Sequence, residues 1–149
     1  MELFPEIDIN KTANRVDKFL KKDLEKLILM SGRSLTDLSS PVLSEAPSHR
    51  NGVNSQEAAI IRGLDAAREV QAIHHTIVNL PETSRTILIG LYIKHESWTL
   101  VQQRIYREHT QLSILRRQAL IQFADSFDYY QQHYGCIPCV DLHVYKTEL

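Results

Sequence analysis

Apolar residues recur at helical rather than alternating spacing along nearly the whole chain. Glycine and proline, the residues that most often interrupt helices, occur only five times each. This pattern predicts an all-α protein whose helices are separated by short clusters of turn-forming residues.

The first predicted helix begins after the segment 8–10, where Asp8 or Asn10 can cap free backbone N–H groups, and it runs to about Met30. One of its faces is a continuous apolar stripe, formed by Val16, Phe19, Leu20, Leu24, Leu27 and Ile28. A second stripe, nearly opposite the first, is basic and consists of Lys11, Arg15, Lys18, Lys22 and Lys26. This basic face is either an ordinary solvated surface or a surface for phosphates or a protein partner.

Residues 31–54 are rich in serine, proline, glycine and asparagine, which predicts a linker or a partly ordered loop. Asn54 and Glu57 form a capping pair, so a second long helix is expected to begin at Ser55. The apolar residues of this helix drift around its axis, so we expect it to be covered on two sides as a central spine. His74 lies in its apolar sector and is interpreted as a hydrogen-bonded core or boundary histidine.

Three further helices are predicted towards the C-terminus. The first follows Pro81 and covers about 82–93, the second is short and covers about 99–105, and the third covers about 110–127. The segment that follows is aromatic and is expected to be irregular. These boundaries predict an N-terminal helix, a linker, a helical domain and a C-terminal extension, over residues 1–30, 31–54, 55–128 and 129–149.

Only residues 106–109 separate the last two predicted helices. A short helix, a tight turn and a longer amphipathic helix form the helix–turn–helix arrangement that enters the major groove of DNA, although a plain helical hairpin is the alternative. Tyr106 is too bulky to adopt a left-handed backbone easily, so a turn of altered shape is expected. Glu108, which precedes the longer helix, is not one of the preferred N-cap residues, and Thr110 is expected to cap this helix instead.

The longer helix has an apolar face and a polar face. The apolar stripe consists of Leu112, Leu115, Ala119, Phe123 and Phe127. The residues expected to contact bases or the groove are Gln111, Ser113, Ile114, Arg117 and Gln118. Arginine can donate two hydrogen bonds to guanine, and glutamine can pair with adenine. The residues expected to hold DNA phosphates are Arg104, Arg107 and Arg116.

Several segments resemble known transcription proteins. One set consists of residues 80–82, 87–92 (ILIGLY), 97–101 and 119–120. Together these segments resemble the fourth conserved region of sigma factors, which reads promoter DNA. A second set of segments consists of 3–8 (LFPEID), 14–20, 32–38, 40–42 and 121–127. Through them the chain resembles the ArpU family of phage transcriptional regulators from about residue 3 to Phe127.

The resemblance implies an activator that binds double-stranded promoter DNA and controls late genes, those for packaging and lysis, in phages and prophages of Gram-positive bacteria. Sigma-like domains also contact RNA polymerase, so polymerase is the second implied partner. The competing hypothesis is a module that binds RNA polymerase or a sigma factor without reading DNA itself. The basic face of the first helix could serve either role. The promoter sequence and the number of subunits stay open.

The 149-residue chain has 17 Lys+Arg and 18 Asp+Glu, a formal net charge of -1, which argues against avid nonspecific binding to polyanions. The cations gather, however, on the first helix and between Arg104 and Arg117, which predicts modest, salt-sensitive DNA binding. No apolar run approaches the ~20 residues of a membrane-spanning helix, and the N-terminus has no secretory signal. A protein of the host bacterial cytoplasm with no membrane partner is expected.

The C-terminal extension contains two cysteines and two histidines at short spacing, His133, Cys136, Cys139 and His143. Zinc accepts such a ligand set, but the favoured interpretation is two reduced cysteines that pack the extension, with no metal or other cofactor. Glycine-rich phosphate loops, nucleophile elbows and paired-histidine metal motifs are absent from the sequence. The chain is therefore expected not to be an enzyme.

Overall fold

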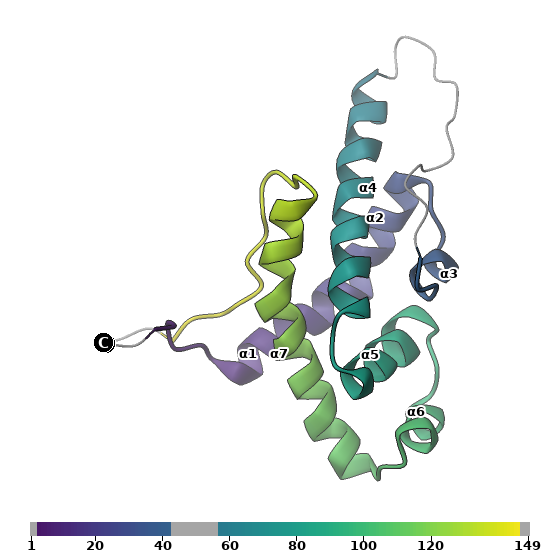
Figure 1. Cartoon of the computed structure of the whole chain (residues 1–149), viewed down its shortest axis with the longest axis vertical. Helices are drawn as coiled ribbons and strands as arrows, with labels where there is room; N and C mark the ends of the chain where they lie inside the picture. Colours follow the sequence, from purple (N-terminus) through teal and green to yellow (C-terminus); the bar gives the residue numbers. More distant parts are fainter. Residues whose placement is uncertain (1–2, 43–56, 147–149) are drawn as a thin grey trace.

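The computed structural model of the chain describes residues 3–42 and 57–146, and all of the regular elements there are helices, which confirms the all-α prediction. In order they are α1 (Ile9–Lys18), η1 (Phe19–Asp23), α2 (Leu24–Ser31), α3 (Leu35–Leu38), α4 (Glu57–Val78), α5 (Glu82–Leu88), η3 (Ile89–Ile93), α6 (Trp98–Ile105) and α7 (His109–His133). The elements η1 and η3 are π-helical turns. Figure 1 shows α4 with α2 and α7 beside it and with α5 and α6 at its lower end.

The N-terminal rod consists of α1, η1 and α2 in direct succession. The side chain of Asp8 accepts a hydrogen bond from the backbone N–H of Lys11 at 3.0 Å, so one of the two predicted caps is confirmed. Phe19 and Leu20 are both buried at the π-helical turn, which adds a residue to the ordinary helical period. Gly32, with a left-handed φ of 76°, ends the rod. The predicted apolar stripe packs against α4 and α7.

Helix α4 packs against α2 on one side and α7 on another, and its C-terminal half is largely buried as predicted. Towards its N-terminal end, however, Ile60, Ile61 and Leu64 are between 44% and 53% exposed. The predicted two-sided cover is wrong at this end of α4 because α2 ends beside Gly63. There the carbonyl oxygen of Met30 lies 3.2 Å from the position that a Cβ on Gly63 would take. The described residues therefore cover the spine over only part of its length.

The segment predicted as a linker contains the short helix α3, which the sequence interpretation missed. The backbone N–H of Ser34 donates to the carboxylate of Asp37 at 3.1 Å, and this local cap supports a single helical turn. His74 is 6% exposed and its Nε2 lies 2.6 Å from the carbonyl oxygen of Ser40, which confirms the predicted hydrogen-bonded histidine. The expected helix start at Ser55 and the rest of the linker lie outside the described residues.

Helix α7 is longer than predicted and ends at His133 rather than near Phe127. The irregular start expected for the C-terminal extension is therefore wrong. No proline or glycine interrupts the helix before Gly135, whose left-handed φ of 72° follows the helix end. Tyr130 also stacks on His75 of α4, with ring centroids 4.5 Å apart, and this contact holds the added helical turn.

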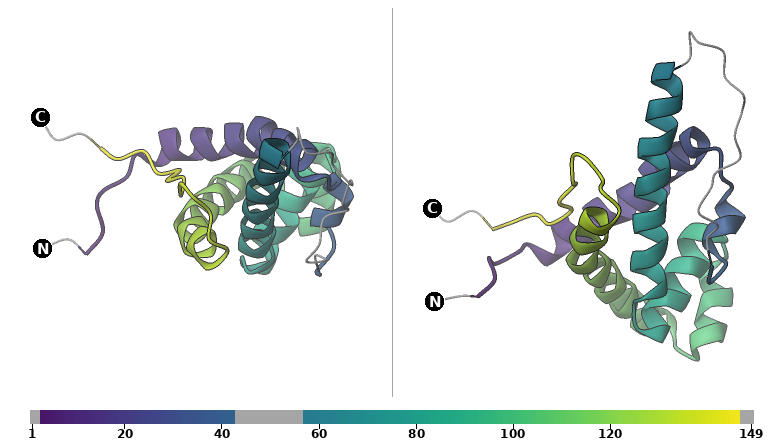
Figure 2. Two further views of the ribbon diagram at one scale, coloured as in Figure 1. Left: turned by 90° about the horizontal axis from the view of Figure 1, so that it is seen from above. Right: turned by 45° about the horizontal axis from the view of Figure 1, so that its top comes forward.

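The rest of the C-terminal extension packs back towards the start of α1, so the two ends of the described chain lie side by side (Figures 1 and 2). The buried side chain of Gln131 exchanges two hydrogen bonds of 2.8 Å with the backbone of Val140. Backbone hydrogen bonds join Asp8 to Val144 at 2.7 Å and Lys146 to Glu6 at 3.0 Å. The extension is therefore an integral part of the fold.

One hydrophobic core joins α1, α2, α4 and α7. Within it Phe19, Phe123 and Phe127 pack ring against ring, with centroids between 5.0 and 6.4 Å apart. Among the described residues, no helix combines the length and the apolar character needed to cross a bilayer.

Candidate nucleic-acid interface

A small apolar cluster holds α6 and the first turns of α7 on α5. It contains Ile87, Val101 and Leu112, one residue from each helix, and all three are 0% exposed. The hydroxyl of Ser97 accepts a hydrogen bond from the backbone N–H of Leu100 at 3.2 Å and caps α6. The predicted short helix is confirmed, and α7 follows it after a tight turn.

The turn between α6 and α7 has a left-handed backbone at Tyr106, with φ 56° and ψ 46°. The expectation that a bulky residue would alter this turn is wrong, because the Tyr106 side chain is 87% exposed and extends into solvent. The cost is confined to the backbone and amounts to about 1–2 kcal/mol for a residue other than glycine. The backbone N–H of Arg107 donates to the carbonyl oxygen of Gln102 at 3.1 Å and closes the end of α6.

Helix α7 begins at His109, with Glu108 as its N-cap residue. The backbone of Glu108 is extended, at φ -80° and ψ 168°, and its side chain makes no capping hydrogen bond. The prediction of Thr110 as the cap is wrong, because Thr110 already lies inside the helix. The carboxylate of Glu108 nevertheless lies at the positive end of the helix dipole, where a negative charge is favourable.

The first turns of α7 expose most of the residues predicted to contact bases, and the opposite stripe is largely buried as predicted. Gln111, Ile114, Arg117 and Gln118 are exposed, whereas Ser113 is half-buried. Within the described residues, the side chains of Gln111, Arg117 and Gln118 make no hydrogen bond or ion pair. This end of α7 lies at the far end of the molecule from the start of α4 (Figure 1), so these groups are available to an external partner.

Two of the three arginines predicted to hold phosphates are at the surface. Arg104 is exposed and forms an ion pair with Glu96, which precedes α6. Arg107 is exposed, and its Nη1 donates to the carbonyl oxygen of Tyr106 at 3.2 Å. Both guanidinium groups are accessible to a phosphate.

Arg116 differs because its guanidinium is bonded inside the molecule, with the side chain 24% exposed. Its Nη2 donates to Oδ1 of Asp17 at 2.8 Å, and its Nε donates to the hydroxyl of Tyr92 at 3.2 Å. The guanidinium carbon lies 5.9 Å from the centre of the Trp98 ring. A phosphate contact by Arg116 stays a prediction, whereas its internal contacts link α7 to α1, η3 and α6.

Asp17 is the acceptor at the centre of this cluster. Its Oδ1 also accepts a hydrogen bond from the hydroxyl of Tyr92 at 2.5 Å, and its Oδ2 lies 3.2 Å from Nζ of Lys21. Burial disfavours the charged carboxylate, but the hydrogen bonds from Tyr92, Lys21 and Arg116 outweigh it and lower the pKa of Asp17. Burial, together with the neighbouring carboxylate, raises the pKa of Tyr92, so its hydroxyl stays protonated.

The sequence interpretation missed Asp17, Tyr92 and Trp98 as residues of this region. Asp17 lies next to the basic stripe of the first helix. Its hydrogen-bond partner, Arg116, is 99 positions further along the chain. Tyr92 lies in the predicted helix that covers about 82–93. The available signal was that all three lie in segments with a likeness to transcription proteins, Asp17 in 14–20, Tyr92 in 87–92 and Trp98 in 97–101.

The basic face of the N-terminal rod is exposed along its length. It consists of Lys11, Arg15, Lys18, Lys22 and Lys26. Arg15 donates from Nη1 to the carbonyl oxygen of His143 at 3.0 Å, and within the described part of the chain the four lysine side chains make no hydrogen bond or ion pair. The face lies on a different side of the rod from Asp17, which is directed at α7.

The structure separates the candidate zinc ligands. The thiol of Cys136 is buried beside the carboxylate of Glu69, whereas both ring nitrogens of His143 are bonded to the carboxylates of Asp125 and Asp141. Among the described residues, no group of three or more His, Cys, Asp or Glu side chains is placed to hold a metal ion. The described residues therefore do not bring His133, Cys136, Cys139 and His143 together as one ligand set.

The chain is similar over most of its length to a protein of Enterococcus hirae named "Putative autolysin regulatory protein ArpU". The two are 33% identical over 131 residues, which cover 85% of this chain and 93% of the relative. The chain belongs to the ArpU family. The resemblance to this family noted in the sequence is thereby confirmed.

A second relative of this ArpU-family chain is an "Uncharacterized phage-related protein" of Listeria innocua. It is 29% identical over 131 residues, which cover 83% of the chain and 93% of the relative. No family model matches the chain, and no solved structure matches it.

Proposed function

We propose that this ArpU-family protein is a transcriptional regulator of phage origin that binds double-stranded promoter DNA through a helix–turn–helix. The motif would consist of α6, the turn at 106–108 and the first turns of α7. The observation that carries the proposal is the exposed set of Gln111, Arg117 and Gln118 at one end of the molecule, whose side chains have no partner among the described residues. The protein would act in the cytoplasm of the host bacterium as a binding protein and not as an enzyme.

The names of the relatives bear on the genes that would be controlled. One name refers to regulation of an autolysin and the other to a phage. Both fit an activator of phage late genes, those for packaging and lysis.

The dimensions of α7 suit the major groove, because a helix with its side chains is about 10–12 Å across and the groove is about 12 Å wide. Arg117 would donate two hydrogen bonds to guanine, and Gln118 or Gln111 would pair with adenine. Arg104 and Arg107, at the end of α6 and in the turn, would hold phosphates at the rim of the groove. Few cations are involved, so binding should be modest and should weaken as salt is added.

A second function is supported by the basic face of the N-terminal rod. Its cations are exposed on a side of the rod that differs from the side of Asp17, so they would meet a partner other than the DNA bound by α7. An acidic surface on RNA polymerase or a sigma factor has the complementary charge. In this function the protein would bind polymerase without reading DNA itself.

A footprint of the purified full chain on its own prophage DNA, with and without RNA polymerase, tests the proposal. Promoter reading predicts a protected site with the protein alone. Arg117→Ala with Gln118→Ala should weaken binding to that site about 10- to 100-fold. Arg62→Ala with Gln132→Ala, which removes one exposed arginine and one exposed glutamine elsewhere, is the matched control and should leave binding unchanged.

The same assay separates the two functions. Lys18→Ala with Lys22→Ala should leave the footprint of the protein alone intact. Direct reading of DNA is contradicted if Arg117→Ala with Gln118→Ala keeps the footprint while the lysine changes abolish binding to polymerase.

A further inference from the structure

The ion pair between Asp17 and Arg116 joins the N-terminal rod to the helix that carries the proposed DNA-reading face. The carboxylate and guanidinium atoms are 2.8 Å apart, and the two side chains are only 21% and 24% exposed. Tyr92 is hydrogen-bonded to both partners. The pair is therefore held on several sides, unlike an exposed ion pair between two mobile side chains.

The direction of Arg116 determines the direction of its neighbours on α7. Successive residues of an α-helix are about 100° apart around the axis, so an Arg116 directed at α1 turns Arg117 and Gln118 towards solvent. Trp98, whose ring lies beside the Arg116 guanidinium, also stacks on His109 with ring centroids 5.1 Å apart. The first residue of α7 and a residue two turns later are thus held by the same indole ring.

We infer that Asp17 is a positioning residue for DNA recognition, because through Arg116 it fixes the rotation of α7 and so the direction of Arg117 and Gln118. The inference rests on the proposed function. It assigns Arg116 to the interior of the protein rather than to a DNA phosphate. It also makes the N-terminal rod a part of the DNA-reading unit, since the carboxylate comes from α1.

Asp17→Asn tests this inference, because the amide keeps the shape of the side chain and removes its negative charge. Dissociation constants are measured by fluorescence anisotropy at several salt concentrations, for the protected promoter duplex and for a random-sequence duplex of the same length. The affinity for the promoter duplex should fall about tenfold, with the affinity for the random duplex and the salt slope unchanged. Asp65→Asn, which breaks the exposed ion pair with Arg68 on α4, is the matched control and should have no effect.

Arg116→Lys is the second variant, and it carries the test if thermal melting shows that Asp17→Asn is unfolded. Lysine keeps the positive charge but cannot bond Asp17 and Tyr92 together as a planar guanidinium does. It should therefore reproduce the loss of affinity for the promoter duplex. A lysine variant that binds this duplex as tightly as the wild type overturns the inference.

Two results with Asp17→Asn also overturn it. If Arg116 contacts a phosphate, the variant frees its charge, binds both duplexes more tightly and steepens the salt slope by about 0.9. If Asp17 serves stability alone, the variant melts at a lower temperature and binds both duplexes as the wild type does. A wild-type protein that binds the two duplexes equally contradicts the proposed function itself, and the inference falls with it.

Discussion

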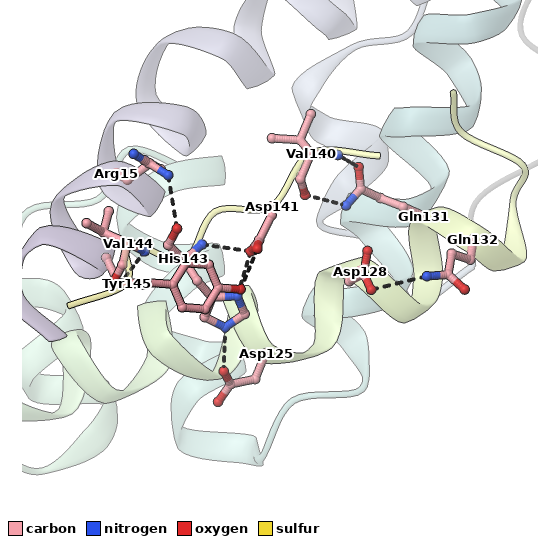
Figure 3. Close-up of polar contacts among 11 residues, drawn as sticks. Arg15, Asp125, Asp128, Gln131, Gln132, Val140, Asp141, His143, Val144 and Tyr145 are labelled. Atoms are coloured by element: carbon pink, nitrogen blue, oxygen red, sulfur yellow. Dashed lines mark hydrogen bonds and ion pairs between the residues drawn. The ribbon is translucent and has the colours of Figure 1, made fainter. Parts of the chain in front are cut away.

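Nε2 of His143 lies 2.7 Å from Oδ1 of Asp125, and this contact joins the C-terminal extension to α7 (Figure 3). The other ring nitrogen, Nδ1, lies 2.7 Å from Oδ1 of Asp141, whose second oxygen accepts a hydrogen bond from Tyr145. A neutral imidazole has a single N–H, so two carboxylate acceptors favour the imidazolium form. Burial lowers the pKa of His143, but the hydrogen bonds to the two carboxylates outweigh it and raise the pKa above its usual value.

The free energy of unfolding should therefore depend on pH through His143. A folded-state pKa above the unfolded value of about 6.5 gives a stabilisation that is complete below that pH and is lost as the pH rises through the folded-state pKa. His143→Gln should lower the free energy of unfolding by about 1 kcal/mol near pH 6, and by less near pH 9. Urea denaturation across this range measures the difference.

The control for this measurement is His95→Gln, because His95 is exposed. This variant should follow the pH dependence of the wild type. If His143→Gln lowers the free energy of unfolding by the same amount across the pH range, the imidazole acts as a neutral hydrogen-bonding group instead.

Gly90→Ala should destabilise the protein by about 1–3 kcal/mol, because the added methyl group has no room. A Cβ at Gly90 would lie 2.9 Å from Oε1 of Glu96 and 2.9 Å from Cγ2 of Val101. Val101 is fully buried in the cluster that holds α6, so it cannot move aside cheaply. Urea denaturation measures the loss. In the Gly90→Ala variant, a further Val101→Ala change should lower the free energy of unfolding by less than the same change does in the wild type. A Gly90→Ala variant as stable as the wild type would contradict the close approach of Val101 to Gly90.

Tyr106→Gly should raise the free energy of unfolding by about 1 kcal/mol, because glycine adopts the left-handed backbone without the steric cost of a Cβ. The tyrosine ring is mostly exposed, so little packing is lost. Tyr106→Ala is the control, because alanine keeps the steric cost of a Cβ in the left-handed backbone. It should not raise the free energy of unfolding. Thermal melting distinguishes the two variants. Equal melting temperatures for glycine and alanine would show that the backbone at this position is not strained.

The two cysteines should differ strongly in their reaction with iodoacetamide. Cys139 is exposed, whereas Cys136 is 6% exposed. Burial and the neighbouring carboxylate of Glu69 raise the pKa of Cys136 to about 12, which keeps it as an unreactive thiol. Mass spectrometry of the native protein should find rapid modification of Cys139 alone, and a metal chelator should not change the rates. Equal rates for both thiols, or rates that rise with chelator, would contradict this arrangement.

Much of the fold could be predicted because caps and apolar stripes act within one or two helical turns. The Asp8 cap, the bounds of α6 and the apolar stripe of α7 depend on neighbours a few positions away. The same locality allowed the exposed set on α7 to be chosen, because Gln111, Arg117 and Gln118 lie opposite a buried stripe. The left-handed backbone at Tyr106 was not predictable in this way, since the packing of α6 and α7 imposes it against the local preference.

The sequence by itself determined most of the helices, their apolar and polar faces, and the family to which the chain belongs. Only the tertiary structure decided which polar side chains are available to a partner and which are used inside the molecule. Arg116 and Arg117 are adjacent in sequence, yet one is bonded to Asp17 from a distant helix and the other has no partner in the described part of the chain. The period of a helix gives the direction of a side chain, but what lies in that direction depends on segments that meet only when the core is packed.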